Sequence, residues 1–516
     1  MNVVFRTDAS LTIGTGHVMR CLTLAGALRE CGATVSFVCR EHKGHLCGLI
    51  GEQGFSLNRL PAPSADYQSE DTLAHADWLG ARWQDDAEST RAIIDGLDAR
   101  PDWLIVDHYA IDRRWESFLR AVVGRIMVID DLADRAHDCD LLLDQNLVAK
   151  MHTRYVDKVP AECRLLLGLE YALLQPLYAE LHNQAAPREG AIHRILIYFG
   201  GADSENLTGQ TITAFLLLNR QDIEVDVVIG SNTPFAETIR QQVLGHRNIH
   251  LHNSLPTLAM LMINADLAVG AGGATSWERL CLGLPSLVVT LADNQRPIAE
   301  KLHQFGMIRW LGHRDTVDES KISLALGELI QQGLDREWSS CCLATVDGNG
   351  VNRVSAVLTA NANTPLQVRS ASLGDEEILL RWANDPVTRQ NAFSTQPIPA
   401  ATHKAWFRNR LCNKENCRLY IVETIDRVPL GQVRFERQNK AWEVHYVLAP
   451  VFRGRGLGHV MLKAALSKFR ADIGDGTLII GQVKITNPAS QKIFQKLGFE
   501  TRADEGGETV VYRRML

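Results

Sequence analysis

Short runs of apolar and β-branched residues, each ended by a small or acidic residue, recur along the first part of the chain. Four of them lie at residues 3–9, 34–40, 103–109 and 125–131. Longer stretches with helical spacing, such as VMRCLTLAGALRECG, separate these runs. Parallel strands that are covered on both faces are near-continuous apolar runs, and helices connect them. The alternation therefore predicts βαβ units and a doubly wound sheet.

A second series of the same kind follows the polar stretch NQAAPREGAIH, with runs at 194–201, 224–230, 267–273 and 285–291. The α/β fold class should therefore comprise two tandem Rossmann-like halves. After Val346 the composition turns to Gly, Asn, Ala and Thr, and a new α+β pattern follows. The predicted domains are a Rossmann-like half at 1–188, a second half at 189–345, a linker at 346–364 and an α+β domain at 365–516.

Composition narrows the class of protein. The net charge of -6 over 516 residues argues against a nucleic-acid partner, because phosphate binding needs clustered Lys and Arg. No apolar run reaches the ~20 residues that cross a bilayer, and the first residues lead into a polar loop. We expect a cytoplasmic protein with no membrane partner. The eleven cysteines lack zinc or redox spacing, so we expect no metal.

The C-terminal part contains a glycine-rich loop between a strand and a helix. The strand AWEVHYVLAP (441–450) runs into RGRGLG (453–458), and HVMLKAALSKF then has helical periodicity. Glycines let successive N–H groups turn toward one point, and a helix N-terminus adds positive potential. The element suits a pyrophosphate, and the alternative is a tight turn with incidental glycines.

A second signal follows at a suitable distance. The strand LIIGQV precedes Asn487-Pro488-Ala489-Ser490, which opens a helix that ends in KLGFE. Together these segments resemble the GNAT family of N-acetyltransferases. The resemblance implies acetyl-CoA as co-substrate and direct attack of an amine on the thioester. It assigns the co-substrate to Arg453, Gly454, Arg455, Gly456, Gly458, Asn487 and Ser490.

A general base must accept a proton from the incoming ammonium. Glu443 and His445 alternate along one strand and so share a face, and both remain candidates. Members of the family often carry a Tyr, which protonates the departing thiolate, where this chain has Phe494. Tyr446 is a weak substitute, so the acid stays unassigned.

The start of this domain, residues 380–411, resembles amino-sugar N-acetyltransferases. By that likeness Trp382, Asn384, His403 and Trp406 fall near the acceptor, although core packing explains either Trp equally well.

The N-terminal part has polar residues where ligands of doubly wound sheets bind, beyond the carboxyl ends of the strands. The first strand ends in RTDA (6–9), and the loop IGTGHVMRC (13–21) opens a helix. This loop lacks the third glycine of the dinucleotide fingerprint, which excludes an NAD site. Histidine titrates near neutral pH, so His17 is a candidate base, with Asp8 close enough in sequence to orient it. Alternatively, His17 caps the helix.

Three further segments follow predicted strands. Asp107-His108-Tyr109 lines the same cleft or forms a structural turn. FGGADSEN (199–206) offers N–H groups to a phosphate, and GAGGATSWERLCLGLPSLVV (270–289) places Glu278 where it can accept hydrogen bonds from a ribose. A plain glycine-rich turn is the alternative for the last segment.

This pairing of loops resembles the GT-B architecture of sugar-nucleotide enzymes. The segments FRTDAS…IGTGHVMR and GAGGATSWERLCLGLPS resemble the family of UDP-2,4-diacetamido-2,4,6-trideoxy-β-L-altropyranose hydrolases over roughly residues 1 to 345. The resemblance implies metal-independent release of UDP, with His17 activating water and Asp8 orienting it. The implied substrate-binding residues are Gly14, Gly16, Arg20, Tyr109, Gly200, Gly201, Gly272, Gly273, Thr275, Glu278, Asn294 and Gln295, together with Trp382 and Asn384 of the acetyltransferase.

Taken together, the resemblances imply a bifunctional enzyme that acetylates a UDP-linked 4-amino sugar and then hydrolyses the product, in pseudaminic acid biosynthesis. UDP-linked amino sugars are the expected partners, and other enzymes of the nonulosonic acid pathway are candidates. Three alternatives stay open: a glycosyltransferase in the N-terminal part, a non-catalytic C-terminal module, and a sugar of legionaminic-type stereochemistry.

Overall fold

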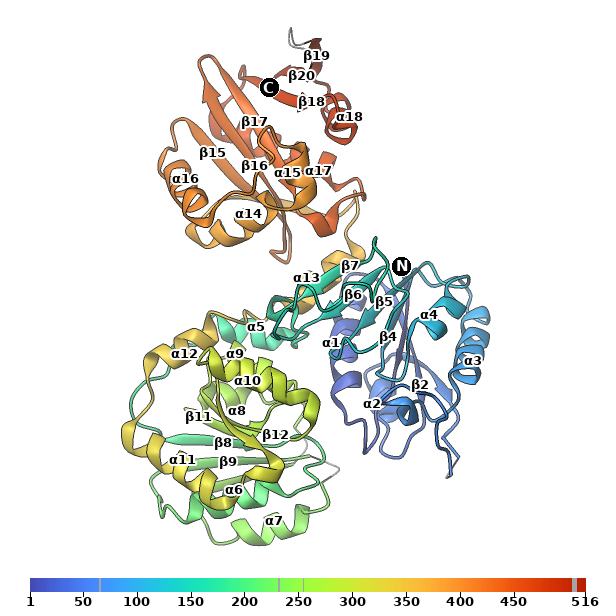
Figure 1. Cartoon of the computed structure of the whole chain (residues 1–516). Helices are drawn as coiled ribbons and strands as arrows, with labels where there is room; N and C mark the ends of the chain where they lie inside the picture. The colour runs from blue at the N-terminus through green and yellow to red at the C-terminus, as the bar shows by residue number, and fades with distance from the viewer. Residues whose placement is uncertain (65, 231–232, 254, 504–507) are drawn as a thin grey trace. The chain divides into compact units, whose positions relative to one another are not determined.

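The computed structural model describes residues 1–64, 66–230, 233–253, 255–503 and 508–516. This part of the chain divides into two compact units, Met1–Val354 and Ser355–Leu516. Three sheets are present among the described residues, two in the first unit and one in the second, and helices flank each of them (Figure 1).

The first sheet has seven parallel strands in the order β3-β2-β1-β4-β5-β6-β7. Every residue of β4 is buried, as expected for a strand that helices cover on both faces. The strand order reverses between β1 and β4, so the loops after these strands open at a topological switch point. The strands are β1 (Asn2–Thr7), β2 (Thr34–Arg40), β3 (Ser56–Leu60), β4 (Trp103–Asp107), β5 (Arg125–Ile129), β6 (Leu141–Asp144) and β7 (Arg164–Leu167). The helices are α1 (Gly16–Glu30), α2 (Cys47–Glu52), η1 (Ala76–Leu79), α3 (Trp83–Asp95) and α4 (Arg113–Leu119).

The second sheet has six parallel strands in the order β10-β9-β8-β11-β12-β13. Its strands are β8 (Arg194–Tyr198), β9 (Glu224–Ile229), β10 (Ile249–Asn253), β11 (Leu267–Ala271), β12 (Ser286–Thr290) and β13 (Arg309–His313). The helices of this half are η2 (Leu169–Tyr171), α5 (Pro176–His182), α6 (Leu207–Leu216), α7 (Ala236–Val243), α8 (Ala259–Asn264), α9 (Thr275–Cys281), η3 (Asp293–Gln295), α10 (Arg296–Gln304), η4 (Arg314–Thr316), α11 (Glu319–Gln332), α12 (Arg336–Leu343) and α13 (Gly350–Thr359).

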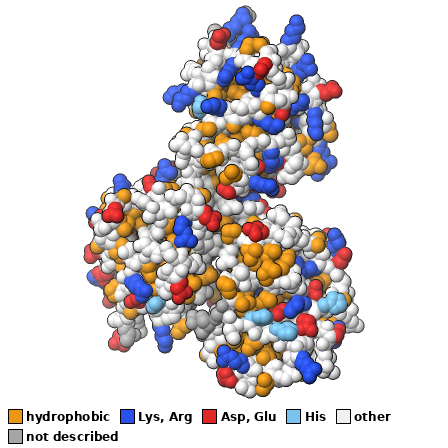
Figure 2. Space-filling model, turned by 180° about the vertical axis from the view of Figure 1, so that it is seen from behind, with side chains coloured by type: hydrophobic (Ala, Val, Ile, Leu, Met, Phe, Trp, Pro, Cys, Tyr) orange, Lys and Arg blue, Asp and Glu red, His pale blue; other side chains and the backbone are white. Residues whose placement is uncertain are grey.

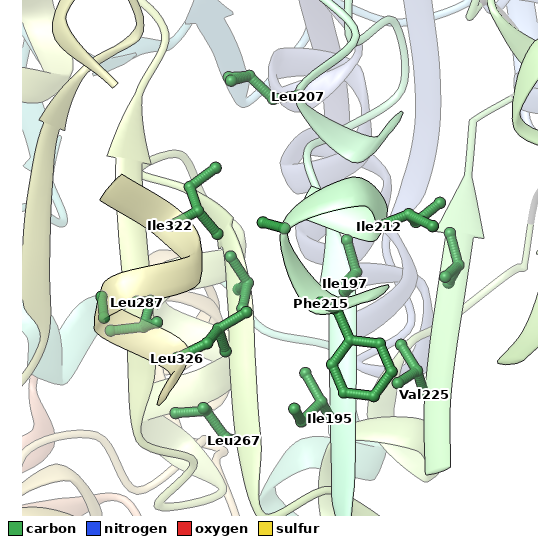
Figure 3. Close-up of a cluster of buried hydrophobic side chains, with 14 of the residues drawn as sticks. Ile195, Ile197, Leu207, Ile212, Phe215, Val225, Leu267, Leu287, Ile322 and Leu326 are labelled. Atoms are coloured by element: carbon green, nitrogen blue, oxygen red, sulfur yellow. The ribbon is translucent and has the colours of Figure 1, made fainter. Parts of the chain in front are cut away.

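An aliphatic core joins this second sheet to helices α6 and α11 (Figure 3). Ile195 and Ile197 of β8 face Phe215 of α6, and Leu326 comes from α11. Each is almost fully buried, and burial of such a side chain stabilises the fold by roughly 1.5–3 kcal/mol. The core holds the strands rigidly, which leaves the loops at their carboxyl ends to carry ligand-binding groups.

The third sheet, in the C-terminal unit, has the order β14-β15-β16-β17-β18-β20-β19. Neighbouring strands are antiparallel except β17 and β18, which run parallel and pair only at the start of β17, from Ala441 to Glu443. The strands are β14 (Leu366–Ser370), β15 (Cys417–Thr424), β16 (Pro429–Gln438), β17 (Ala441–Leu448), β18 (Leu478–Lys484), β19 (Glu500–Ala503) and β20 (Thr509–Met515). The helices are η5 (Leu373–Asp375), α14 (Glu376–Ala383), α15 (Pro386–Asn391), α16 (Ala400–Cys412), η6 (Pro450–Phe452), α17 (Leu457–Ile473) and α18 (Pro488–Lys496).

The predicted fold class of two Rossmann-like halves followed by an α+β domain is confirmed. The segment predicted as a linker, 346–364, contains helix α13. Its first part packs on the first unit, since Arg353 donates to Glu170 O at 2.8 Å and pairs with Asp347. Of the residues that suggested a linker, Gly350 and Asn352 lie in the first turn of this helix, whereas Gly348 and Asn349 precede it and Asn361 and Asn363 follow it.

Candidate active sites

His17 lies in the first turn of α1 and is held by a carboxylate from the neighbouring strand β4. Its Nδ1 is 2.6 Å from Asp107 Oδ1. A carboxylate can only accept, so Nδ1 carries the hydrogen and the lone pair is on Nε2. His17 is 8% exposed and lies beyond the carboxyl end of β1, where ligands of doubly wound sheets bind. The pair therefore has the geometry of an oriented general base.

Asp107 is itself fixed by a guanidinium. Arg20, one turn after His17, donates to both carboxylate oxygens at 2.6 Å and reaches Asp131 at 2.7 Å. Although burial opposes ionisation, Arg20 and His17 hold the pKa of Asp107 well below its usual range. Asp107 therefore stays ionised and keeps His17 in one tautomer.

The structure gives His17 a different partner from the Asp8 that sequence proximity suggested. Asp8 is fully buried, and its carboxylate lies 2.7 Å from Arg6 Nη1 and accepts from the Arg40 amide at 2.6 Å. Its second oxygen lies 3.2 Å from His108 Nε2. Parallel pairing of β1 with β4 sets Asp107 opposite Thr7, the residue before Asp8. Because side chains alternate along a strand, Asp8 projects away from the side on which Asp107 meets His17.

An aromatic group stands beside His17. The Tyr109 ring meets the imidazole edge-on at 4.5 Å between centroids, and its hydroxyl donates to Asp131 at 2.6 Å. Trp78 stacks on Tyr109 at 5.6 Å, and His75 lies 4.4 Å from Trp78. Tyr109 was a sequence candidate, whereas His75 and Trp78 were missed because they lie outside the strand ends. Asp131 was also missed, although it follows a predicted strand as Asp107 does.

The second half places its glycine loops at the carboxyl ends of β8 and β11. Gly200 has φ 96°, and a Cβ on Gly201 would lie 3.7 Å from Thr15 Oγ1 in the loop before His17. A Cβ on Gly272 would lie 3.5 Å from Gln295 Oε1. Gln295 Oε1 also accepts from the Leu291 amide at 2.9 Å. Of these positions only Gly272 is tight, since its Cβ would also lie 3.1 Å from Thr290 Cγ2, and Gly200 needs glycine for its positive φ. Glycines here let the backbone come close to a ligand.

The remaining sequence candidates of this unit lie nearby. Gly14 has φ 81° and closes the turn before α1, and Gly16 is the first residue of that helix. Thr275 begins α9, and Asn294 is exposed in η3 beside Gln295. Burial raises the pKa of Glu278 in α9 to about 7. A carboxylate in such a place gains from hydroxyl donors, as a ribose would supply.

In the C-terminal unit, the separation of β17 from β18 opens one edge of each strand. β17 stays paired with β16 through Leu448, so only its β18 side is free of strand partners beyond Glu443. The loop after β17 has Gly454 and Gly456 at φ 79° and 77°, and Gly456 precedes the 17-residue helix α17. Free strand amides and a glycine loop before a long helix suit the amides and the pyrophosphate of an acyl-CoA.

Three residues assigned to the co-substrate have other contacts. Arg453 donates to Asp385 at 2.6 Å and to Thr388 at 2.7 Å, and Arg455 donates to Val357 O. A Cβ on Gly458 would lie 2.8 Å from Ile493 Cδ1, so this glycine permits close packing of α17 on α18. These arginines shape the loop, whose backbone remains the candidate anion-binding part.

The two candidate bases lie together on one face of β17. Glu443 Oε1 is 3.6 Å from His445 Nε2. Glu443 also lies directly opposite Glu436 of the neighbouring strand β16. Burial and the facing carboxylate raise the pKa of Glu443 above its usual value. Burial and Arg434 lower the pKa of His445 to about 4. Of the two, Glu443 is therefore the stronger base near neutral pH. Sequence reasoning missed Glu436 because only strand register makes it a neighbour.

The predicted acceptor residues have structural contacts. Asn384 exchanges two hydrogen bonds with the backbone of Ile398, at 2.9 and 2.7 Å. Trp382 is buried in α14, and His403 stacks on Phe407. Trp406, by contrast, lies 5.0 Å from the guanidinium of Arg434, on the face that carries Glu443.

Lys and Arg outnumber Asp and Glu in the C-terminal unit although the whole chain is negative. Figure 2 shows blue side chains gathered over its upper part. Such a surface attracts polyanions.

Within the described residues, no group of three or more His, Cys, Asp or Glu is arranged to hold a metal ion. The described helices include none long and apolar enough to span a membrane.

Comparison with known proteins agrees with this two-part organisation. Residues 366–500 match the family described as acetyltransferase (GNAT) domain. UDP-2,4-diacetamido-2,4,6-trideoxy-beta-L-altropyranose hydrolase of Campylobacter jejuni is 26% identical over 308 residues, which cover 59% of this chain and 97% of that protein. The spore coat polysaccharide biosynthesis protein SpsG of Bacillus subtilis is 26% identical over 202 residues, 39% of this chain and 59% of its own length.

One relative matches both parts at once. The uncharacterized protein MJ1062 of Methanocaldococcus jannaschii is 21% identical over 520 residues, 97% of this chain and 97% of its own. The chain therefore joins a region similar to a UDP-sugar hydrolase to a GNAT acetyltransferase domain.

Proposed function

We propose that this protein is a bifunctional nucleotide-sugar enzyme. The C-terminal unit transfers acetyl from acetyl-CoA to the 4-amino group of UDP-4-amino-4,6-dideoxy-N-acetyl-altrosamine. The N-terminal unit then hydrolyses the UDP-2,4-diacetamido-2,4,6-trideoxy sugar to free sugar and UDP. These are consecutive steps of pseudaminic acid biosynthesis. The similarity to a UDP-2,4-diacetamido-2,4,6-trideoxy-beta-L-altropyranose hydrolase supports the UDP-diacetamido sugar as the substrate of the second step.

The observation that carries the hydrolytic half is the His17–Asp107 pair at the mouth of the first sheet. In the proposed reaction, His17 Nε2 removes a proton from water while the water oxygen bonds to the anomeric carbon. The bond from that carbon to the UDP oxygen breaks, and UDP leaves with the electron pair. Asp107 stabilises the imidazolium that forms. In this scheme the oriented base activates the attacking water, so the proposed reaction uses no metal.

The two halves of the unit divide the remaining tasks. The loops at Gly200–Gly201 and Gly272–Gly273 contact the diphosphate, while the Gly272 amide stays bonded to Val289 O, and Glu278 accepts from the ribose. Asn294 and Gln295 contact the sugar. Tyr109, Trp78 and His75 form an aromatic wall suited to the 6-methyl and acetamido methyl groups, which offer only apolar contact.

The acetyl transfer needs a base for the ammonium of the acceptor. Acetyl-CoA supplies the activated acyl group when bound at the separated strands. In the proposal Glu443 takes the proton from the acceptor nitrogen, because its pKa is raised above that of an ordinary carboxyl group. His445 lies beside it and orients the acceptor amine.

The test is mass spectrometry of the products from the UDP-4-amino sugar and acetyl-CoA. The wild-type protein should yield free diacetamido sugar and UDP, and His17→Ala should accumulate the UDP-diacetamido sugar. Sugar release only in the presence of a hydroxyl acceptor would instead make the N-terminal unit a glycosyltransferase. Unchanged acetyl-CoA with every UDP-amino sugar, of either stereochemical series, would contradict the acetyltransferase half.

A further inference from the structure

The point where β17 leaves β18 separates two sets of side chains on β17. Glu443 and His445 project to the face that α14 and α16 cover, and Tyr446 projects to the opposite face, toward the core with α17. A thioester lying at the free edge of β17 would therefore have a carboxylate on one side and a phenol on the other.

The phenol of Tyr446 is anchored at the end of this opening. Its Oη lies 2.7 Å from the hydroxyl of Ser490, in the first turn of α18. Asn487 fixes that turn, because its side chain accepts from the Ser490 amide at 3.1 Å. The hydroxyl pair thus joins β17 to α18 at a point beyond the last paired residues of β17 and β18, Glu443 and Ile480.

The helix itself offers no acid one turn further on. Phe494 lacks a hydroxyl, and its ring is 2% exposed and stacks on Tyr512 at 5.0 Å. A Cβ on Gly481 of β18 would lie 2.4 Å from Phe494 Cζ, so the tip of the ring points into the sheet. Phe494 therefore packs in the core and carries no proton to donate, whereas Tyr446 of β17 carries a hydroxyl beside Ser490.

We infer that Tyr446, supported by Ser490, is the proton donor to the departing thiolate, an inference that rests on the proposed acetyl transfer. The acceptor nitrogen bonds to the acyl carbon and gives its proton to Glu443. As the carbon–sulfur bond breaks, its electron pair stays on sulfur, and the Tyr446 hydroxyl proton moves to that sulfur. The phenolate recovers a proton from solvent through the Ser490 hydroxyl.

The surroundings of the phenol suit this role. Burial raises the pKa of Tyr446 to about 12, so the group keeps its proton at neutral pH until a stronger base forms next to it. The same burial disfavours a CoA thiolate that has no proton donor beside it, because desolvation penalises any charged form. A hydrogen bond to a charged group is stronger than one between neutral groups, so the phenol stabilises the thiolate as it forms.

The first test measures the bound thiol and needs no acceptor. CoA labelled with carbon-13 next to sulfur is titrated by NMR while bound to the full chain, to Tyr446→Phe and to Tyr420→Phe. Tyr420 is a matched control, since it is buried on the same face of the sheet and donates to Asp472 at 2.7 Å. Loss of the Tyr446 hydroxyl should make the bound thiol about ten-fold less acidic, and the control should match the wild type. Identical titrations of all three proteins would overturn the inference.

The second test separates binding from chemistry. Tyr446→Phe should lower kcat for acetyl transfer by about 10²-fold with the KM for acetyl-CoA changed less than two-fold, the range expected for loss of a general acid. Ser490→Ala should lower kcat several-fold. A kcat within two-fold of the wild type in Tyr446→Phe would exclude the role.

The two experiments also distinguish this inference from the proposed function. A shifted thiol titration in a protein that acetylates none of the UDP-amino sugars would support Tyr446 and contradict the proposed acceptor. An unshifted titration in a protein that acetylates the UDP-amino sugar would do the reverse. Failure of the wild-type chain to bind CoA would overturn both.

Discussion

Asp107 in the first unit and Glu443 in the second are both carboxylates beside a histidine, yet their surroundings act in opposite directions. Asp107 receives Arg20 on both oxygens, and its pKa falls well below the usual range. Glu443 lies opposite Glu436 of the neighbouring strand, and burial together with that carboxylate raises the pKa of Glu443. A carboxylate surrounded by cations stays ionised and can only orient a base, whereas a carboxylate facing another one can itself take a proton. The neighbouring charges, and not the residue type, therefore decide whether a carboxylate orients a base or acts as the base.

The largest expected effect is on the base that Asp107 orients. His17→Ala should lower UDP release by about 10³-fold or more and leave acetyl transfer unchanged, because general-base catalysis contributes about 10²–10⁴-fold. Both products are measured in one reaction of the full chain. His137→Ala is the matched control, since His137 is also buried and its Nδ1 lies 2.7 Å from a carboxylate oxygen of Glu116. Should His137→Ala, measured per folded molecule, lose UDP release to the same degree, the role of His17 would be structural.

The next effect tests the carboxylate that acts as a base. Glu443→Gln should lower kcat for acetyl transfer by about 10²-fold and leave UDP release intact, because the amide cannot accept the ammonium proton. Glu423→Gln, a buried carboxylate of the same sheet bound to Arg369 at 2.9 Å, serves as control. If His445→Gln causes the larger loss, the assignment of the base moves to His445.

A smaller catalytic effect should follow when the carboxylate that orients the His17 imidazole is replaced by an amide. Asp107→Asn should lower UDP release by about 10–10²-fold, because the amide no longer selects the Nδ1–H tautomer. It should also destabilise the unit by about 3–5 kcal/mol, since Arg20 loses its main partner. Thermal unfolding and kinetics are measured together with Asp86→Asn, whose carboxylate pairs with Arg6 and Arg40 instead. Asp86→Asn should lose stability but keep UDP release, and equal catalytic losses would show that Asp107 acts through the fold alone.

The smallest effect is a shift in pH dependence. Glu443 works when ionised, so acetyl transfer should rise with pH through the pKa of Glu443, which lies above that of an ordinary carboxyl group. Glu436→Gln removes the facing charge and lowers this pKa, so the acid limb of kcat against pH should move to lower pH by less than about one unit. Glu423→Gln should leave the limb in place. A limb that moves to higher pH in Glu436→Gln would contradict the coupling.

The fold could be predicted well because its signals are local. Buried parallel strands are continuous apolar runs, so β1, β2, β4, β5, β8, β9, β11 and β12 were found close to their observed bounds. The edge strands β3, β7, β10 and β13 were missed, since a strand such as Ser56–Leu60 has only two apolar residues in five positions. The central strand β6 was missed as well, because Leu141–Asp144 is only four residues long. Helix α13 was missed because its start is rich in Gly and Asn, which are typical of linkers.

The sites were predicted less completely than the fold. The sequence placed His17 at the start of a helix and Glu443 on a strand, and both placements are correct, because helix starts and strands follow from local sequence features. It paired His17 with Asp8, nine positions away, although the partner in space is Asp107, ninety positions away. It also assigned Arg453 to the co-substrate, which stays a prediction, and did not find the contact of the Arg453 side chain with Asp385.

The amino-acid sequence by itself determined the elements, the two glycine-loop motifs and the residue types available for proton transfer. Tertiary structure alone decided which carboxylate meets which histidine and therefore which of them is held ionised. The reason is physical: secondary structure follows from the periodicity of near neighbours, whereas a pKa depends on charges within a few ångströms in space. Asp107 and Glu436 became functional neighbours of His17 and Glu443 only when β4 paired with β1 and β16 paired with β17.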